Sequence, residues 1–449
     1  MYIVRMDKSL PRFIVILALA SIGLVAVSWW QAGQRSSVEM TLLEDYFAES
    51  IHRTGSATDR LIDRLQTSLR SDPDGWQAYG QLGIAYLQKA RENGDPAYYQ
   101  KSAGVLEKAL SIEPEDYVSI SAMGALASAR HQFHEALEWA ERARSINPDR
   151  PYAYGIIADA QVELGLYAEA VQTLQLMVDL RPDMSSYSRI SYLRELHGDT
   201  EGALEMMQWA VDSGAPNSES TAWTRTQLGN LYFNSGNLEM AEQEYARTLT
   251  DYPGYVYALA GLGRVRQAQG STDEGIDLIK RASQSIPIPE FIIALADIYK
   301  MNGEPEATQE QIELLQVIQS LYQANGVDMD LEIALFNTDH GIDLTTTLAQ
   351  ARRAFERRPS IYAADVLAWI LYKNGKYEEA RAFSDQALRL GTRDALKLYH
   401  AGMIQYRLGD HAQARQYLER ALAINPYFSI LYSQEAQRTR DELKAASLE

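Results

Sequence analysis

The chain has 449 residues, of which 46% are hydrophobic and 23% are charged, and this composition excludes a wholly disordered protein. Its 42 lysine and arginine residues against 60 aspartate and glutamate residues give a formal net charge of −18. Nucleic acid is therefore not expected as a partner, because binding to phosphates requires a cationic surface. The absence of cysteine excludes disulfides, thiolate metal sites and cysteine nucleophiles.

The first predicted element is a transmembrane helix at residues 13–30. This stretch is uncharged and would span about 27 Å as a helix, enough to cross the hydrocarbon core of a bilayer. Arg5, Lys8 and Arg12 precede it, so the positive-inside rule predicts that residues 1–12 are cytoplasmic. We therefore expect a single-pass membrane protein whose remaining residues are extracytoplasmic, in a bacterial periplasm.

A cleaved signal peptide is the alternative for the same segment. Ala26 and Ser28 are small residues at the positions that cleavage before Trp29 would require. The pair Trp29-Trp30 favours the membrane anchor, because tryptophan is enriched at the membrane interface.

A polar stretch at residues 31–58 is predicted to be a juxtamembrane linker. Leu61, Ile62, Leu65 and Leu69 then follow at helical spacing. They predict a helix over 59–70 that opens the folded part of the chain, because Ser71-Asp72-Pro73 ends it.

The rest of the chain has an internal repeat. Pro114, Pro148 and Pro182 are 34 residues apart, and Pro253 and Pro287 repeat this interval. Most side chains are small at a second recurring position, where the two helices of a hairpin must touch closely: Ala109, Ala143, Met177, Ala210, Thr248, Ala282, Ala354, Ala387 and Ala421. Nine units are visible at this position, and the double interval between Ala282 and Ala354 predicts a tenth.

One unit shows the full pattern, with an apolar first helix, a glycine turn, a second helix and a terminal proline: Leu228-Gly229, Tyr232, Gly236, Ala241, Tyr245, Thr248 and Pro253. This pattern resembles the tetratricopeptide repeat family. The resemblance implies an all-α, right-handed α-solenoid of about ten helical hairpins over 59–426. A capping helix beginning at Phe428 is predicted within 427–449, because a solenoid needs a polar outer face at its end.

Two kinds of irregularity are expected. Between residues 304 and 359 the pattern continues into a long helix through Leu321, and Asn337-Thr338-Asp339 stands where an apolar turn is usual. Longer connections at 89–96 and 212–221 are predicted to be loop insertions on the solenoid surface.

No catalytic, cofactor-binding or metal-binding residues are assigned, and we do not expect an enzyme. His131 and His134 form a His-Gln-Phe-His sequence, which we interpret as two solvated loop histidines rather than a metal site. Two Asp-His pairs occur at similar turns, and for both we predict a helix-capping carboxylate and an exposed ring: Asp339-His340 and Asp410-His411.

In the family that the pattern resembles, certain first-helix positions line the concave face of the solenoid. They predict these candidate partner-binding residues: Tyr362, Trp369, Tyr372, Tyr399, Tyr406, Trp223, Asn230, Phe233, Tyr257 and Arg264. The same positions include Tyr152, Asp159 and Tyr192. For the cluster between Tyr362 and Tyr406 a role in binding and a role in packing are both open, because tyrosines also belong to the core of the repeat. The lysine of the family's carboxylate clamp has no counterpart beside Asn230 and Arg264, which disfavours a receptor for C-terminal peptides.

The sequence therefore predicts a non-catalytic scaffold, tethered to a membrane, that binds a protein or peptide in the concave groove of the solenoid. The first alternative is an accessory or assembly subunit of an envelope enzyme complex. The second is a secreted solenoid released by signal-peptide cleavage. An enzyme that uses a metal at His131 and His134 is the third.

Overall fold

The computed structural model describes residues 56–446, and within this range it contains 22 α-helices and no strands. The predicted transmembrane segment at 13–30, the segment at 1–12 and most of the predicted linker lie outside the described residues. In the part of the chain that is described, no helix combines the length and the apolar composition needed to cross a bilayer.

The first described helix, α4 (Ala57–Ser71), corresponds to the helix predicted over 59–70. Ser56 and Asp59 form a capping box at its start, in which each side chain accepts a hydrogen bond from the backbone N–H of the other residue. Ile62 and Leu65 are buried in a cluster with residues of the next helix, so α4 packs as the lone opening helix that the sequence predicts.

Ten helical hairpins follow α4, and we call them units 1 to 10. Units 1 to 5 are α5 (Trp76–Asn93) with α6 (Ala97–Ile112), α7 (Tyr117–Ala129) with α8 (Phe133–Ile146), α9 (Pro151–Glu163) with α10 (Tyr167–Leu180), α11 (Met184–Leu196) with α12 (Thr200–Asp212), and α13 (Glu219–Asn234) with α14 (Leu238–Asp251). Units 6 to 10 are α15 (Val256–Ala268) with α16 (Thr272–Ser285), α17 (Pro289–Asn302) with α18 (Pro305–Ala324), α19 (Asp330–His340) with α20 (Leu344–Arg357), α21 (Ile361–Lys373) with α22 (Tyr377–Ala387), and α23 (Ala395–Leu408) with α24 (His411–Ile424). The last helix is α25 (Ser433–Ala446). The helical repeat predicted from the sequence is confirmed.

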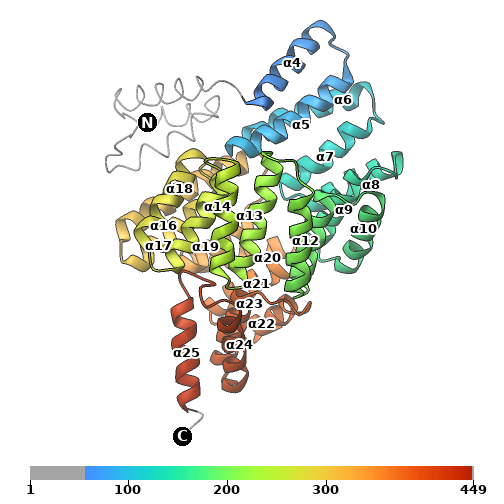
Figure 1. Cartoon of the computed structure of the whole chain (residues 1–449). Coiled ribbons are helices and arrows are strands. Elements are labelled where there is room, and N and C mark those ends of the chain that lie inside the picture. The colour runs from blue at the N-terminus through green and yellow to red at the C-terminus, as the bar shows by residue number, and fades with distance from the viewer. Residues whose placement is uncertain (1–55, 447–449) are drawn as a thin grey trace, which may run out of the picture.

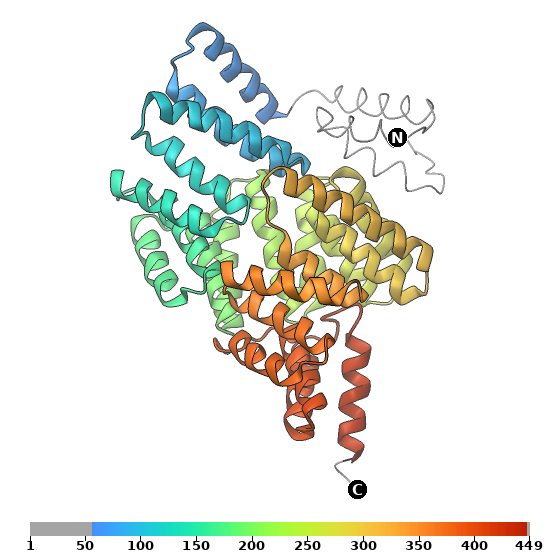
Figure 2. The same cartoon turned by 180° about the vertical axis from the view of Figure 1, so that it is seen from behind.

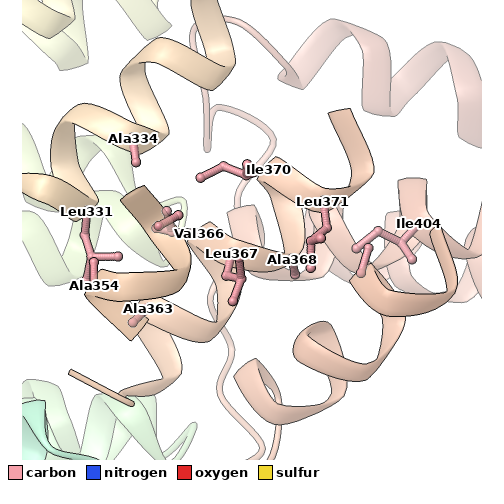
Figure 3. Close-up of a cluster of buried hydrophobic side chains, with 12 residues drawn as sticks. Leu331, Ala334, Ala354, Ala363, Val366, Leu367, Ala368, Ile370, Leu371 and Ile404 are labelled. Carbon is pink, nitrogen blue, oxygen red and sulfur yellow. The ribbon is translucent and has the colours of Figure 1, made fainter. Parts of the chain in front are cut away.

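The recurring position singled out in the sequence lies at the contact between helices. None of its nine side chains is more than 3% exposed. Ala143, for example, is buried in one cluster with Ile120 of the same unit and Ala153 of the next. The same kind of packing continues to the end of the solenoid, where Leu331, Val366 and Ile404 come together from α19, α21 and α23 (Figure 3). In most units this side chain is alanine or threonine, because a larger one would separate the two helix backbones, whereas unit 3 accommodates Met177.

The predicted irregularities are present in modified form. Helix α18 has 20 residues, as the apolar pattern up to Leu321 indicates, whereas α19 has only 11. The prediction of a loop over 89–96 is wrong for most of its length, because α5 continues as helix to Asn93 and ends at Gly94, which has a left-handed φ of 69°. The predicted capping helix begins later than expected, at Ser433, and an irregular segment precedes it.

The solenoid curves with the first helix of each unit on its inner side. First helices of neighbouring units touch one another, as in α5 with α7, α7 with α9 and α21 with α23. Within residues 56–446 no two second helices of neighbouring units are in comparable contact. Helices that lie closer together line the concave side of a curved stack. We call this side the inner face.

The solenoid also winds far enough for its two halves to touch. In unit 2, the backbone carbonyl of Arg130 accepts a hydrogen bond of 3.0 Å from the backbone N–H of Asp328. The Nδ1 atom of His131 lies 2.6 Å from the carbonyl oxygen of Asp328, 197 residues further along the chain. In unit 3, the hydroxyl of Tyr167 accepts a buried bond of 2.8 Å from the backbone N–H of Ile361. Figures 1 and 2 show the orange helices of units 8 and 9 beside the green helices of units 3 and 4.

These contacts follow a regular rule. The turn inside unit 1 contacts the connection that follows unit 6, the turn inside unit 2 contacts the connection that follows unit 7, and so on up to unit 5 and the connection that follows unit 10. Gly94 of unit 1 approaches Ile286, Gly198 of unit 4 approaches Gly391, and the Phe233 carbonyl of unit 5 accepts a 3.0 Å hydrogen bond from Asn425. Contacts between distant units are uncommon in repeat proteins, whose units usually meet only their neighbours. Here they join two successive turns of the solenoid into one body.

Candidate partner-binding surface on the inner face

Three aromatic side chains stand exposed on the inner face of units 3 to 5. They are Tyr152 on α9, Tyr192 on α11 and Trp223 on α13, with exposed fractions of 50%, 45% and 42%. Each lies on the first helix of its unit, at a position that the repeat pattern assigns to the concave face. A large aromatic ring left this exposed is available for contact with a partner.

Surrounding protein atoms partly desolvate the hydroxyls of Tyr152 and Tyr192, although both side chains are exposed. Burial raises the pKa of both the Tyr152 and the Tyr192 hydroxyls above the usual value for tyrosine. This matches the position of both residues on the inner side of the curve.

An ion pair lies among these rings. Arg189 of α11 donates two hydrogen bonds to Asp159 of α9, from Nε to Oδ1 at 2.9 Å and from Nη2 to Oδ2 at 2.8 Å. Burial by itself would lower the pKa of Arg189, but the attraction of Asp159 outweighs it and the pKa is raised. Nearby, Glu195 accepts a bond of 3.3 Å from Asn234, and burial raises its pKa. This part of the inner face therefore combines exposed rings with fixed polar groups.

The inner face of units 9 and 10 differs, because two of its predicted aromatic residues are covered. Trp369 and Tyr399, both predicted as partner-binding residues, are 0% exposed. The Trp369 ring stacks on Tyr372 at 4.7 Å and on His400 at 4.2 Å, and its Nε1 donates a 2.8 Å hydrogen bond to Asp339. In this structure Trp369 and Tyr399 present no surface to a partner.

The segment that covers these residues is the chain's own C-terminal part. The ring of Tyr432 stacks on Tyr399 at 5.1 Å and meets Trp369 edge-on at 5.3 Å. Its hydroxyl donates a 2.7 Å hydrogen bond to the same Asp339 carboxylate oxygen that accepts from Trp369. Tyr399 in turn donates a 2.9 Å hydrogen bond to Glu435.

The other predicted residues lie in three kinds of surroundings. Tyr362, Tyr372, Tyr406 and Tyr257 are half-buried. Asn230 is bonded to the Tyr245 hydroxyl at 2.7 Å. Phe233 is only 4% exposed and lies beneath the guanidinium of Arg264, at 4.2 Å from the ring centre. That any of the ten residues binds a partner stays a prediction, but three of them, Phe233, Trp369 and Tyr399, are buried.

The histidines have structural contacts that the sequence did not indicate. His131 is not a solvated loop residue, because it bonds to the Asp328 carbonyl of the next solenoid turn, whereas His134 is exposed. Within residues 56–446 no group of three or more His, Asp or Glu side chains is arranged to hold a metal ion.

The two Asp-His pairs behave differently. Asp410 caps α24 by accepting from the Gln413 N–H at 3.0 Å, as predicted. The exposed ring predicted for His340 is wrong, since its side chain is 2% exposed and its Nε2 lies 2.9 Å from Asp297.

Two residues that organise this face were not identified from the sequence. Arg189 is not among the residues predicted for the concave surface, and its ion pair with Asp159 appears only when α9 and α11 are placed side by side. For Asp339 the sequence did indicate something unusual, because Asn337-Thr338-Asp339 stands where the repeat pattern has an apolar turn. The structure explains this departure: Asp339 receives hydrogen bonds from Trp369 and Tyr432.

Comparisons with known proteins agree with this architecture. Models of the tetratricopeptide repeat match residues 127–194, 226–287 and 366–427. The TPR repeat-containing protein YpiA of Bacillus subtilis (strain 168) is 26% identical over 219 residues, which cover 48% of this chain and 49% of that protein. The chain thus matches about half the length of this curated relative.

Among solved structures, that of the APC/C hetero-tetramer Cut9-Hcn1 is similar with a TM-score of 0.48 and 16% identity, covering 97% of this chain and 84% of that one. YrrB, described as a TPR protein with an unusual peptide-binding site, is similar with a TM-score of 0.28 and 19% identity, covering 41% of this chain and 94% of that one. Three segments of the chain are thus similar to the tetratricopeptide repeat, and the ten stacked hairpins continue the same all-helical architecture between and beyond them.

Proposed function

We propose that this chain is a non-catalytic interaction scaffold that binds a segment of another protein on the inner face of units 3 to 5. The observation that carries the proposal is the row of exposed rings on successive first helices: Tyr152, Tyr192 and Trp223. Tyrosine and tryptophan are enriched among the residues that dominate binding energy at protein interfaces. The repeat family in general consists of protein-interaction scaffolds, which supports the same reading.

A small-molecule pocket is less well supported. Two surface depressions on the described residues are lined by other side chains than the three exposed rings: one by Arg225 and Gln243 of unit 5, and the other by Tyr377 of unit 9 and Leu408 of unit 10. Sites for small ligands are usually enclosed and largely apolar. A row of rings and an ion pair on successive helices is better matched to an extended segment of a partner protein.

Cross-linking in cells followed by mass spectrometry tests the proposal by identifying the partner. Binding of that partner is then compared for Trp223→Ala and Trp209→Ala. Trp209 is a matched control, because it is 46% exposed but belongs to the second helix α12 on the outer side of unit 4. We expect Trp223→Ala to weaken binding by about 2 kcal/mol and Trp209→Ala to leave it within about 0.5 kcal/mol.

Equal effects of the two substitutions would place the binding surface outside the inner face. Co-purification with a single enzyme would instead identify the chain as an accessory subunit of that enzyme.

We further propose that the scaffold is tethered to a membrane, with the solenoid on the extracytoplasmic side. The support is the uncharged stretch at 13–30 preceded by Arg5, Lys8 and Arg12. A reporter active only in the periplasm should function when fused after Glu449. The full-length chain should remain in the membrane pellet, whereas release of a shorter soluble form would show that the segment is a signal peptide.

A further inference from the structure

The C-terminal segment, residues 425–446, reaches much further than a capping helix requires. A cap needs to cover only the last unit of a solenoid. Helix α25 does cover it, since Ala436 and Leu443 are buried in one cluster with Leu418 of α24. The irregular stretch before α25, however, also contacts units 8 and 9 on the inner face.

The distant contacts are concentrated at Tyr432. Its hydroxyl donates to Asp339 of unit 8 at 2.7 Å, and its ring lies 5.3 Å from Trp369 of unit 9. The amino group of Lys373 lies 5.1 Å from the Tyr432 ring centre and 4.6 Å from that of Trp369. One side chain of the C-terminal segment thus connects two units that precede the last one.

Two further residues of the segment complete the contact with unit 10. The ring of Phe428 lies 5.4 Å from that of Tyr399, and Glu435 accepts the 2.9 Å hydrogen bond from the Tyr399 hydroxyl. Burial, together with the charge and hydrogen bond of Glu435, raises the pKa of Tyr399. The inner face of units 8 to 10 therefore binds two rings that are four residues apart and a carboxylate three residues further on.

Most of the remaining α25 side chains face solvent. Glu442 and Lys444, among others, are exposed. The segment contacts the inner face of units 8 to 10 through Phe428, Tyr432 and Glu435, while Ile430 packs against the core cluster of units 6 and 7. A short anchored motif joined to a solvated helix resembles a bound peptide more than it resembles an eleventh hairpin, because no second helix follows α25 within the described residues.

We propose that residues 425–446 act as an intramolecular ligand of the inner face of units 8 to 10, and that a partner protein binds there through a segment of the same chemistry. That segment carries two aromatic residues four positions apart followed by an acidic residue three positions later, and it exchanges with the chain's own C-terminal segment. The inference deepens the proposed scaffold function by adding a second, self-occupied binding surface with a defined partner chemistry. A tethered ligand competes at an effective concentration of the order of millimolar, so binding of the partner is suppressed until the segment detaches.

The test uses a fluorescein-labelled synthetic peptide of residues 425–446 and the full-length protein. The natural chain is compared with a Phe428→Ala/Tyr432→Ala double variant, in which the anchoring rings are removed. We expect the peptide to bind the double variant at least tenfold more tightly than it binds the natural chain. The same peptide with alanine at positions 428 and 432 should not bind. A folded double variant that takes up neither peptide, or both equally, overturns the proposal.

A milder pair of variants covers the outcome in which the double variant does not fold. Glu435→Gln weakens the bond from Tyr399, whereas Glu442→Gln changes an exposed carboxylate of the same helix. Hydrogen exchange in α21 and α23 should be faster in Glu435→Gln than in Glu442→Gln. Equal exchange in the two variants, together with an unfolded double variant, would show that the segment is a structural cap only.

The outcome of the peptide experiment does not depend on the outcome of the binding test at Trp223. Partner binding at Trp223 concerns units 3 to 5, and failure there leaves the peptide experiment unaffected.

Discussion

The two halves of the solenoid expose different surfaces: inner-face rings in units 1 to 5 and hairpin turns in units 6 to 10. In units 1 to 5 the turns inside the hairpins are covered by the other half, while three inner-face rings are exposed. In units 6 to 10 the inner-face rings Trp369 and Tyr399 are buried. The turn glycines of this second half, by contrast, have open space around them: Gly270, Gly303, Gly341, Gly375 and Gly409.

This difference teaches that equivalent repeat positions do not have equivalent roles. A turn becomes a structural contact when the winding of the solenoid brings a later connection against it. No hairpin follows unit 10 within residues 56–446, so none of the described connections covers the turns of units 6 to 10. An inner face becomes core when a segment of the same chain lies on it, as at Tyr432. The surface available for binding is thus decided by long-range contacts and not by the repeat itself.

The largest expected effect contrasts tryptophans on the inner faces of the two halves. Trp369→Ala should lower the free energy of unfolding by about 3–5 kcal/mol, because it removes a fully buried ring and leaves a cavity. Trp223→Ala should change it by less than about 0.5 kcal/mol, because that ring is 42% exposed. Urea unfolding monitored by circular dichroism measures both values. Similar losses in the two variants would contradict the contrast between the halves.

An intermediate effect is expected at an ion pair between the two solenoid turns. Arg358 donates to Glu163 at 2.6 Å and to Glu332 at 3.2 Å, and its side chain is only 15% exposed. Arg358→Met should cost about 2–3 kcal/mol, because two partly buried carboxylates lose their cation. The matched control is Arg381→Met, which removes a pair with Glu378 whose side chains are 50% and 72% exposed.

The control should change the free energy of unfolding by less than about 0.5 kcal/mol. In Arg358→Met, hydrogen exchange should rise first at the contact between units 3 and 8. Stability equal to that of the control would mean that this inter-turn contact contributes little to holding the halves together.

The smallest effect compares turn glycines that have the same backbone conformation. Gly165 in unit 3 and Gly375 in unit 9 both have φ of 74°, so replacement by alanine costs each of them about 1 kcal/mol of backbone strain. A Cβ atom at Gly165 would lie 2.6 Å from the Pro359 carbonyl oxygen, whereas one at Gly375 has no neighbour within 4 Å.

Gly165→Ala should therefore cost about 1–2 kcal/mol more than Gly375→Ala, because the two solenoid turns must move apart. Thermal melts of the two variants measure this difference directly. A difference near zero would show that the turns separate without cost.

Much of the fold could be predicted from the sequence, because the residues that repeat are those that make contacts within a hairpin and between neighbouring hairpins. The small residues at the helix contacts, such as Ala143 and Ala421, were identified from spacing alone, and they are buried. The length of α18 and the departure at Asp339 were also visible. The predicted positions of Trp369 and Tyr399 on first helices are those that the structure shows, but their burial could not be read from the repeat.

The sequence by itself determined the ten hairpins, their register and the polar composition of the last helix, since these depend on residues within one or two repeat lengths of one another. Only the tertiary structure decided which surfaces are open. His131 meets Asp328 across 197 residues, and Tyr432 meets Asp339 across 93 residues. The angle between successive units accumulates over many repeats, so small differences in helix packing decide whether distant units meet. A periodic sequence pattern does not show this accumulated angle, so it does not show which distant units will meet.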